Sequence, residues 1–162
     1  MIEITSSTTN RDELLGALLS AIMRWQDETQ SFDEAVREKM GINSAEGRCL
    51  SLLYHGPQSA GAIARVSGLT PAAVTALIDR LEARGFLTRT RSTEDRRKVV
   101  VEATEKTREL SARYYGGIAR EGEKMLRTFS DAELGTILEF MTAAADLQHN
   151  ELRKLKAGEQ PD

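Results

Sequence analysis

The chain has 162 residues, of which 40% are hydrophobic and 29% are charged, and its formal net charge is −3. This length is sufficient for one hydrophobic core, and no segment approaches the ~18–20 consecutive apolar residues that a membrane-spanning helix requires. We therefore expect no membrane partner. Because the first ten residues are polar and a single cysteine cannot form an intrachain disulfide, we expect no signal peptide and a cytoplasmic location.

The first predicted element is one long helix over about residues 10–42. Capping residues between Ser6 and Asp12 precede it, and Gly41 is expected to end it. Apolar side chains recur along it at helical spacing, from Leu14 to Val36. Such a helix is too long for one small domain, so part of this face is expected to contact another element or another subunit. An ordinary amphipathic core helix is the alternative.

A second helix is predicted to start at Asn43, because Asn43-Ser-Ala-Glu46 is a capping-box pattern. Its buried side contains Cys49, and Gly56-Pro57 ends it. Cys49 allows two interpretations. It is either a small buried hydrophobic residue among leucines or a redox-sensing thiol, which would need a lowered pKa and solvent access.

The central stretch, residues 59–103, has the pattern of a winged helix-turn-helix. A short helix ends at Gly68, and a second begins with Thr70 as N-cap and Pro71 as first helical residue. Gly85 is expected to end this second helix. Two strand-like runs, 86–91 and 99–103, flank a charged turn. The sequence therefore predicts two helices followed by a β-hairpin, the wing.

The second of these helices is expected to be the DNA-reading helix. Its apolar face consists of Val74, Leu77, Ile78 and Leu81, and the opposite face carries mostly small side chains. The stretch 59–103 contains eight Lys or Arg against five Asp or Glu, a net charge of +3 within an acidic chain. This local excess predicts a defined electrostatic contact with DNA. The positions expected to contact DNA are Thr70, Pro71, Ala72, Ala73, Thr75, Ala76, Arg80, Arg91, Asp95, Arg96, Arg97 and Lys98.

Two further helices are predicted over about residues 104–156. Gly116 and Gly117 are expected to interrupt the first, giving a kink or a close helix crossing. Ser130-Asp-Ala-Glu133 is a second capping box, and it opens the last helix. An apolar stripe with heptad-like spacing, from Leu134 to Leu155, favours a partner helix.

The chain resembles the MarR family of bacterial transcriptional regulators. The resemblance rests on Asp79-Arg-Leu-Glu-Ala-Arg-Gly85-Phe-Leu and on Asp95-Arg96-Arg97 in the wing, and it covers nearly the whole chain. Ala103 and Thr107 depart from the common family pattern of Leu and Gly at these positions. The resemblance points to Arg97 as a residue inserted into the DNA groove, with Asp95 orienting the wing tip.

The expected fold is thus mainly α with a small β-hairpin wing, in a single domain spanning 1–162. Residues 43–103 would form the DNA-binding lobe, and residues 10–42 and 104–156 the dimerisation helices. The resemblance implies a homodimeric regulator, a repressor released by a small aromatic or phenolic ligand. The positions that could line a pocket for such a ligand are Trp25, Thr29, Arg48, Tyr54 and Tyr114. For Trp25, ordinary packing in the core or at an interface is the favoured alternative.

Other functions remain as alternatives. The hairpin could bind an acidic protein, with no operator involved, or Cys49 could make the regulator redox-sensitive. The sequence shows no nucleophile–base pair, phosphate loop or metal-ligand spacing among its two histidines and one cysteine, so no enzyme, cofactor or metal site is expected.

Overall fold

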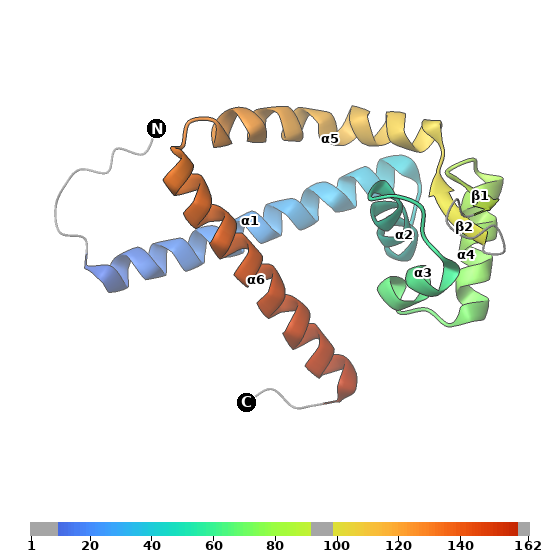
Figure 1. Ribbon diagram of the computed structural model, residues 1–162, viewed down its shortest axis with the longest axis horizontal. Helices are drawn as coiled ribbons and strands as arrows, with labels where there is room; N and C mark the ends of the chain where they lie inside the picture. The colour runs from blue at the N-terminus through green and yellow to red at the C-terminus, as the bar shows by residue number, and fades with distance from the viewer. Residues whose placement is uncertain (1–9, 92–98, 159–162) are drawn as a thin grey trace. The chain divides into compact units, whose positions relative to one another are not determined.

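The structure, a computed structural model, describes residues 10–91 and 99–158. Its contacts divide the chain into two compact units, Met1–Leu110 and Ser111–Asp162. The described residues form six helices and one hairpin, in the predicted order (Figure 1). The prediction of a mainly helical fold with a small two-stranded wing is confirmed.

The first unit begins with helix α1 (Arg11–Met40), whose N-cap is Asn10. Gly41 ends it in the left-handed conformation, with φ of 61°. The amides of Gly41 and Ile42 donate back to the carbonyls of Glu38 and Arg37, which is the Schellman arrangement of a helix end. Val36 is the only buried residue of the 30 in this helix.

Three short helices and a hairpin form the core of the first unit (Figure 1). They are α2 (Ser44–Tyr54), α3 (Ala60–Ser67) and α4 (Pro71–Ala83), followed by β1 (Leu87–Arg91) and β2 (Val99–Ala103). Both predicted capping residues of this region, Asn43 and Thr70, accept hydrogen bonds from the helices that they precede. Apolar side chains of all five elements are packed together in one cluster: Cys49, Leu50, Leu53, Ile63, Val74, Leu77, Ile78, Leu81, Phe86, Leu87, Val101 and Ala103.

The hairpin is antiparallel, and Leu87 pairs with Ala103 and Arg91 with Val99. Strand β1 begins one residue later than predicted, because the amide of Phe86 donates to Leu81 and completes the Schellman end of α4. Gln58 forms an isolated bridge with Val101, and each backbone amide donates to the other's carbonyl at 2.8 Å. The wing is therefore attached both to α4 and to the segment between α2 and α3.

Helix α5 (Glu105–Leu126) leads into the second unit, which also contains α6 (Asp131–Ala157). Helix α5 continues without a break through Gly116 and Gly117, so the predicted interruption is wrong. The helical cost of two glycines, roughly 1 kcal/mol each, is too small to break a helix of 22 residues. The predicted capping box of α6 is confirmed, with reciprocal hydrogen bonds between Ser130 and Glu133.

Helix α6 buries none of its 27 residues.

Among the described residues, no single helix is long and apolar enough to cross a membrane; α3 and α4 reach that length and apolarity only when taken together, across a bend of 105°.

Candidate nucleic-acid interface

Helix α4 separates two kinds of side chain, as the sequence predicts. Val74, Leu77, Ile78 and Leu81 are at most 2% exposed and anchor the helix in the core. The opposite face carries Ala72, Thr75 and Ala76, which are exposed, and Ala73, which is half-buried. Small side chains on an exposed face let a helix come close to the floor of a DNA groove.

The start of α4 is fixed by local hydrogen bonds. The Thr70 hydroxyl accepts from the Ala73 amide at 3.3 Å, and the Thr75 hydroxyl donates to the Pro71 carbonyl at 3.1 Å. Thr70 and Pro71 are both exposed. The first turn therefore presents a defined polar edge next to the small-residue face.

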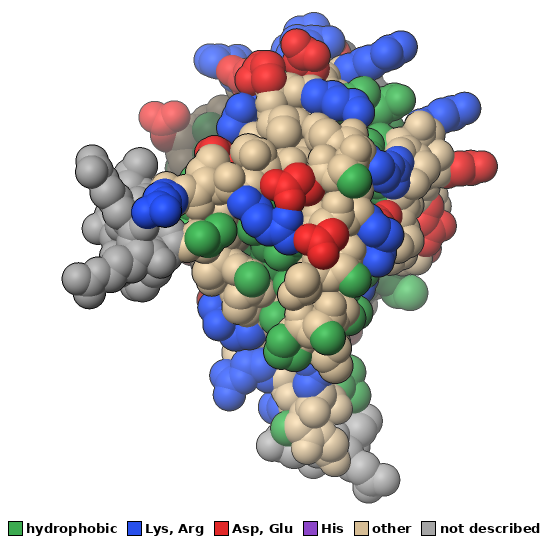
Figure 2. Space-filling view, turned by 90° about the vertical axis from the view of Figure 1, so that its right-hand side faces the viewer, with side chains coloured by type: hydrophobic (Ala, Val, Ile, Leu, Met, Phe, Trp, Pro, Cys, Tyr) green, Lys and Arg blue, Asp and Glu red, His purple; other side chains and the backbone are tan. Residues whose placement is uncertain are grey.

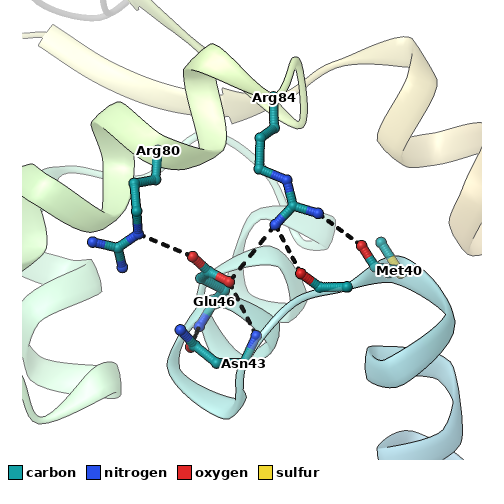
Figure 3. Close-up of polar contacts among 6 residues, drawn as sticks. Met40, Asn43, Glu46, Arg80 and Arg84 are labelled. Atoms are coloured by element: carbon teal, nitrogen blue, oxygen red, sulfur yellow. Dashed lines mark hydrogen bonds and ion pairs between the residues drawn. The ribbon is translucent and has the colours of Figure 1, made fainter.

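Arg80, predicted from the sequence as a DNA contact, has a protein partner. Its Nε donates to Glu46 Oε1 of helix α2 at 3.3 Å, while 54% of its side chain remains exposed (Figure 3). Glu46 is 5% exposed, and its Oε2 also accepts from the Asn43 amide at 3.0 Å. The sequence identified Glu46 only as a capping residue; its second role as the partner of Arg80 depends on a contact 34 residues away.

A second ion-pair network joins α4 to the wing. The Arg89 guanidinium of β1 contacts both Asp79 and Glu82 of α4, and the backbone amide of Arg89 donates to Glu82 Oε1 at 3.1 Å. The hydrogen bond with Asp79 raises the pKa of Arg89 above its ordinary value, so the guanidinium stays charged. In the sequence these residues contribute only to the charge balance and to the family motif, and their pairing becomes visible only in the folded protein.

The charges on this side of the molecule are mixed. Among the described residues on this face, Figure 2 shows Lys and Arg side chains beside Asp and Glu side chains. Arg91 is exposed at the end of β1. Asp95, Arg96, Arg97 and Lys98 lie outside the described residues, so their predicted DNA contacts stay predictions.

The candidate ligand-site residues are distributed over both units. In the first unit, Trp25 is 54% exposed and its carbonyl accepts from the Thr29 hydroxyl one turn later, at 2.8 Å. Arg48 is exposed, and Tyr54 is 70% exposed with its ring edge-on to His55. Tyr114 belongs to the second unit, where it is half-buried. The Thr29 hydroxyl proton is thus used locally, and the pocket stays a prediction.

Cys49 does not have the environment of a redox sensor. It is 1% exposed, and burial, with a smaller effect of the nearby Glu46 carboxylate, raises the pKa of its thiol to about 11. The thiolate is the form that reacts with oxidants, and it is scarce at neutral pH when the pKa is raised. Among the described residues, no group of three or more His, Cys, Asp or Glu side chains is arranged to hold a metal ion.

Comparison with known proteins agrees with this geometry. The model of the MarR family matches residues 42–99, the part that contains α2, α3, α4 and β1. The HTH-type transcriptional regulator YcgE of Bacillus subtilis is 28% identical over 152 residues, which cover 93% of this chain and 99% of YcgE. The HTH-type transcriptional regulator YwhA of the same organism is 33% identical over 101 residues, covering 61% of this chain and 72% of YwhA.

A solved structure shares the fold. The transcriptional regulator Tm0710 of Thermotoga maritima superposes with a TM-score of 0.58 at 24% identity, over 86% of this chain and 99% of Tm0710. Family match, sequence relatives and fold therefore agree with the resemblance in residues 79–87. The chain belongs to the MarR family of DNA-binding transcriptional regulators, which are not enzymes.

Proposed function

We propose that the protein is a homodimeric repressor that binds a pseudo-palindromic DNA operator and is released by a small aromatic ligand. The observation that carries the DNA-binding part is the two-sided helix α4. One face is locked into the core, while the other presents Ala72, Thr75 and Ala76 to solvent. A regulator that contacts chromosomal DNA would act in the cytoplasm.

The homodimer is supported by the exposed apolar side chains of the long helices. On α1, Leu14 is 61% and Leu19 is 63% exposed; on α6, Leu138 is 68% and Leu155 is 61% exposed. Exposed apolar surface of this extent is a mark of protein–protein contact. We assign residues 10–42 and 104–156 to a dimerisation layer and residues 43–103 to the DNA-binding lobe, within one functional domain.

Specificity would come from both shape and direct contact. Alanine can contact a thymine methyl group, and threonine can do so or form a hydrogen bond with a base edge. These few contacts leave a large share of the discrimination to DNA shape and to phosphate positioning. The wing tip, with Arg96, Arg97 and Lys98, would supply cations for the minor groove, beside Arg91 and the exposed part of Arg80.

Repression and ligand release would follow from binding alone. A dimer that covers an operator excludes RNA polymerase from the same DNA, so repression requires no additional surface. A ligand that prefers the dimer with its recognition helices wrongly spaced would shift the population away from the DNA-competent state. Trp25, Thr29, Arg48, Tyr54 and Tyr114 are the proposed ligand-site residues.

Selection of duplexes from a random library, followed by a binding assay at several salt concentrations, tests the DNA-binding proposal. The selected site should be a pseudo-palindrome with half-sites about 10 bp apart, centre to centre. Ala76→Glu should abolish binding because it puts a carboxylate into the DNA-facing surface. Ala132→Glu adds the same charge on the side of α6 opposite the apolar stripe, outside both the lobe and the proposed dimer seam, and should retain binding. An asymmetric site, or equal effects of the two variants, would favour the hairpin as a protein-binding element.

The ligand part has a separate test. Trp25 is the single tryptophan, so its fluorescence reports on the proposed pocket. Adding salicylate should change this fluorescence and lower DNA affinity in parallel. Trp25→Phe should weaken the ligand response more than DNA binding. If ligands that release DNA leave the fluorescence unchanged, the pocket lies elsewhere.

A further inference from the structure

One side chain, Arg84, joins the C-terminal ends of α4 and α1. Its Nη1 donates to the Gly41 carbonyl at 2.9 Å and its Nη2 donates to the Met40 carbonyl at 2.8 Å (Figure 3). These carbonyls lie at the end of α1, where a helix leaves carbonyl groups without intrahelical partners and where a cation is favoured. The planar guanidinium therefore fixes both distance and orientation, which a lysine could not do.

The buried carboxylate of Glu46 lies beside this contact. Its Oε2 is 4.0 Å from Arg84 Nη1, and only 7% of its side chain is exposed. The same carboxylate accepts hydrogen bonds from Arg80 and from the Asn43 amide. Three elements thus meet at one place: the end of α1, the start of α2 and the last turn of α4.

The start of α5 is held by the same end of α4. Lys106 Nζ donates to the Arg84 carbonyl at 2.8 Å, and the Thr104 hydroxyl donates to the Gly85 carbonyl at 2.7 Å. The Thr107 hydroxyl donates to the Phe86 carbonyl at 2.5 Å. Residues 84–86 are therefore hydrogen-bonded to the end of α1 and to the start of α5, the points where these two helices join the DNA-binding lobe.

We propose that Arg84 is a positioning residue for operator recognition, which makes the recognition helix α4 follow the end of α1 and thereby sets the half-site spacing that the dimer accepts. This inference rests on the homodimeric DNA-binding function proposed above. In such a dimer, the distance between the two α4 helices is defined only as well as each α4 is fixed to the helices that form the dimer. Arg84 supplies two hydrogen bonds from the end of α4 to the end of α1.

Arg80 provides a matched comparison. It shares the Glu46 carboxylate with Arg84 and lies one turn earlier on α4, yet its hydrogen bond goes to α2 and not to α1. Replacing Arg80 removes a cation near DNA and one partner of Glu46, and leaves the two bonds from Arg84 to α1. Replacing Arg84 removes the two hydrogen bonds to the end of α1.

The experiment measures spacing discrimination. Affinity is measured for the operator selected by the wild-type protein and for duplexes that have one or two base pairs inserted between the half-sites. The spacing ratio is the affinity for the selected operator divided by the affinity for a duplex with inserted base pairs. Arg84→Met keeps the aliphatic stem near the Phe86 ring, whose centroid lies 4.8 Å from Arg84 Cζ, but removes the guanidinium. This ratio should fall by roughly tenfold, about 1.4 kcal/mol, close to what one hydrogen bond to a charged group contributes.

Two controls separate positioning from loss of stability. Sedimentation and thermal unfolding establish that each variant is a folded dimer, and Arg84→Lys replaces Arg84→Met if the latter is unfolded. Arg80→Met should lower the affinity for all duplexes by a similar factor and leave the ratio unchanged. Amide hydrogen exchange at Gly41 and Ile42 should become faster in Arg84→Met and stay unchanged in Arg80→Met.

The outcomes are distinct. A folded Arg84 variant with the wild-type ratio overturns the positioning role, and so does an Arg80→Met protein whose ratio falls as far as that of Arg84→Met. A wild-type protein that is monomeric or binds no operator overturns the proposed function, and the positioning role with it. That result is read from the wild type alone, before any variant is made.

Discussion

Glu82 on α4 accepts from Arg89 on β1 twice, once from the backbone amide and once from the guanidinium. One carboxylate therefore fixes both the main chain and the side chain of the wing strand to the recognition helix. Since the proposed DNA contacts lie on both elements, this pair sets the angle between the two surfaces that would reach the same operator.

Removing that carboxylate should loosen the wing. We expect Glu82→Ala to lower the free energy of unfolding by roughly 1 kcal/mol, because the pair is partly exposed and its attraction is screened by water. The loss in free energy of operator binding should be larger than the loss in free energy of unfolding. Glu121→Ala, which removes a highly exposed pair with Lys124 on α5, should change stability by at most ~0.5 kcal/mol and leave DNA binding unchanged. Urea unfolding measures stability and a gel-shift titration measures operator affinity. Equal effects of Glu82→Ala and Glu121→Ala would contradict the role of Glu82 in holding the wing to α4.

Cys49 should make stability fall at alkaline pH. Its pKa is raised from 9.0 to about 11 in the folded protein, so the unfolded chain loses the thiol proton first as the pH rises. The stabilising contribution is complete below pH 9 and is lost between about pH 9 and pH 11, at roughly 1.4 kcal/mol per pH unit. Urea unfolding of the wild type and of Cys49→Ala at pH 8 and pH 10 measures it. The difference in free energy of unfolding between the wild type and Cys49→Ala should become smaller or change sign at pH 10. The same difference at both pH values would contradict the raised pKa of Cys49.

The apolar stripe of α6 should hold the dimer together. Replacing both Leu138 and Met141 by Asp places charges in the proposed interface, so dimer formation and operator binding should be lost together. Because these side chains are 68% and 39% exposed, the helical circular dichroism of the lobe in residues 43–103 should be retained. Sedimentation velocity at micromolar concentration gives the oligomeric state. A well-folded wild-type monomer at that concentration would end the dimer proposal.

Arg97, outside the described residues, is the proposed groove contact of the wing. Arg97→Ala should weaken operator binding by roughly 1–3 kcal/mol, the range for an arginine directed at bases. The slope of log affinity against log salt should become shallower by about one unit, because one cation is lost from the phosphate field. Folding should not change. Wild-type affinity with an unchanged salt slope would indicate that the hairpin does not contact DNA.

The sequence predicted the elements well because their limits are set by local chemistry. Asn43, Thr70 and Ser130 each accept a hydrogen bond from an amide three residues later, and Gly41 and Gly85 adopt the left-handed conformation that only a glycine reaches easily. These signals lie within one helical turn and can be recognised without a structure.

The contacts between elements could not be predicted in the same way. Arg84 binds carbonyls 43 and 44 residues away, and Glu46 binds Arg80 across 34 residues. Many arginines in this chain could have been paired with many carboxylates, and only the folded arrangement selects among them. The interruption expected at Gly116 and Gly117 is absent for another reason, because a helical cost of about 1 kcal/mol per glycine is small for a helix of 22 residues.

The wing is a ribbon of two strands, and such a ribbon has two free edges at which a strand from another copy could add and begin aggregation. In this protein the middle of each edge is already occupied. Gln58 pairs with Val101 on the β2 side, and Glu82 takes the amide of Arg89 on the β1 side. A further strand would have to displace a backbone pair on one side and a carboxylate on the other. The same contacts that hold the wing in place thus oppose the addition of a further strand at the centre of both edges.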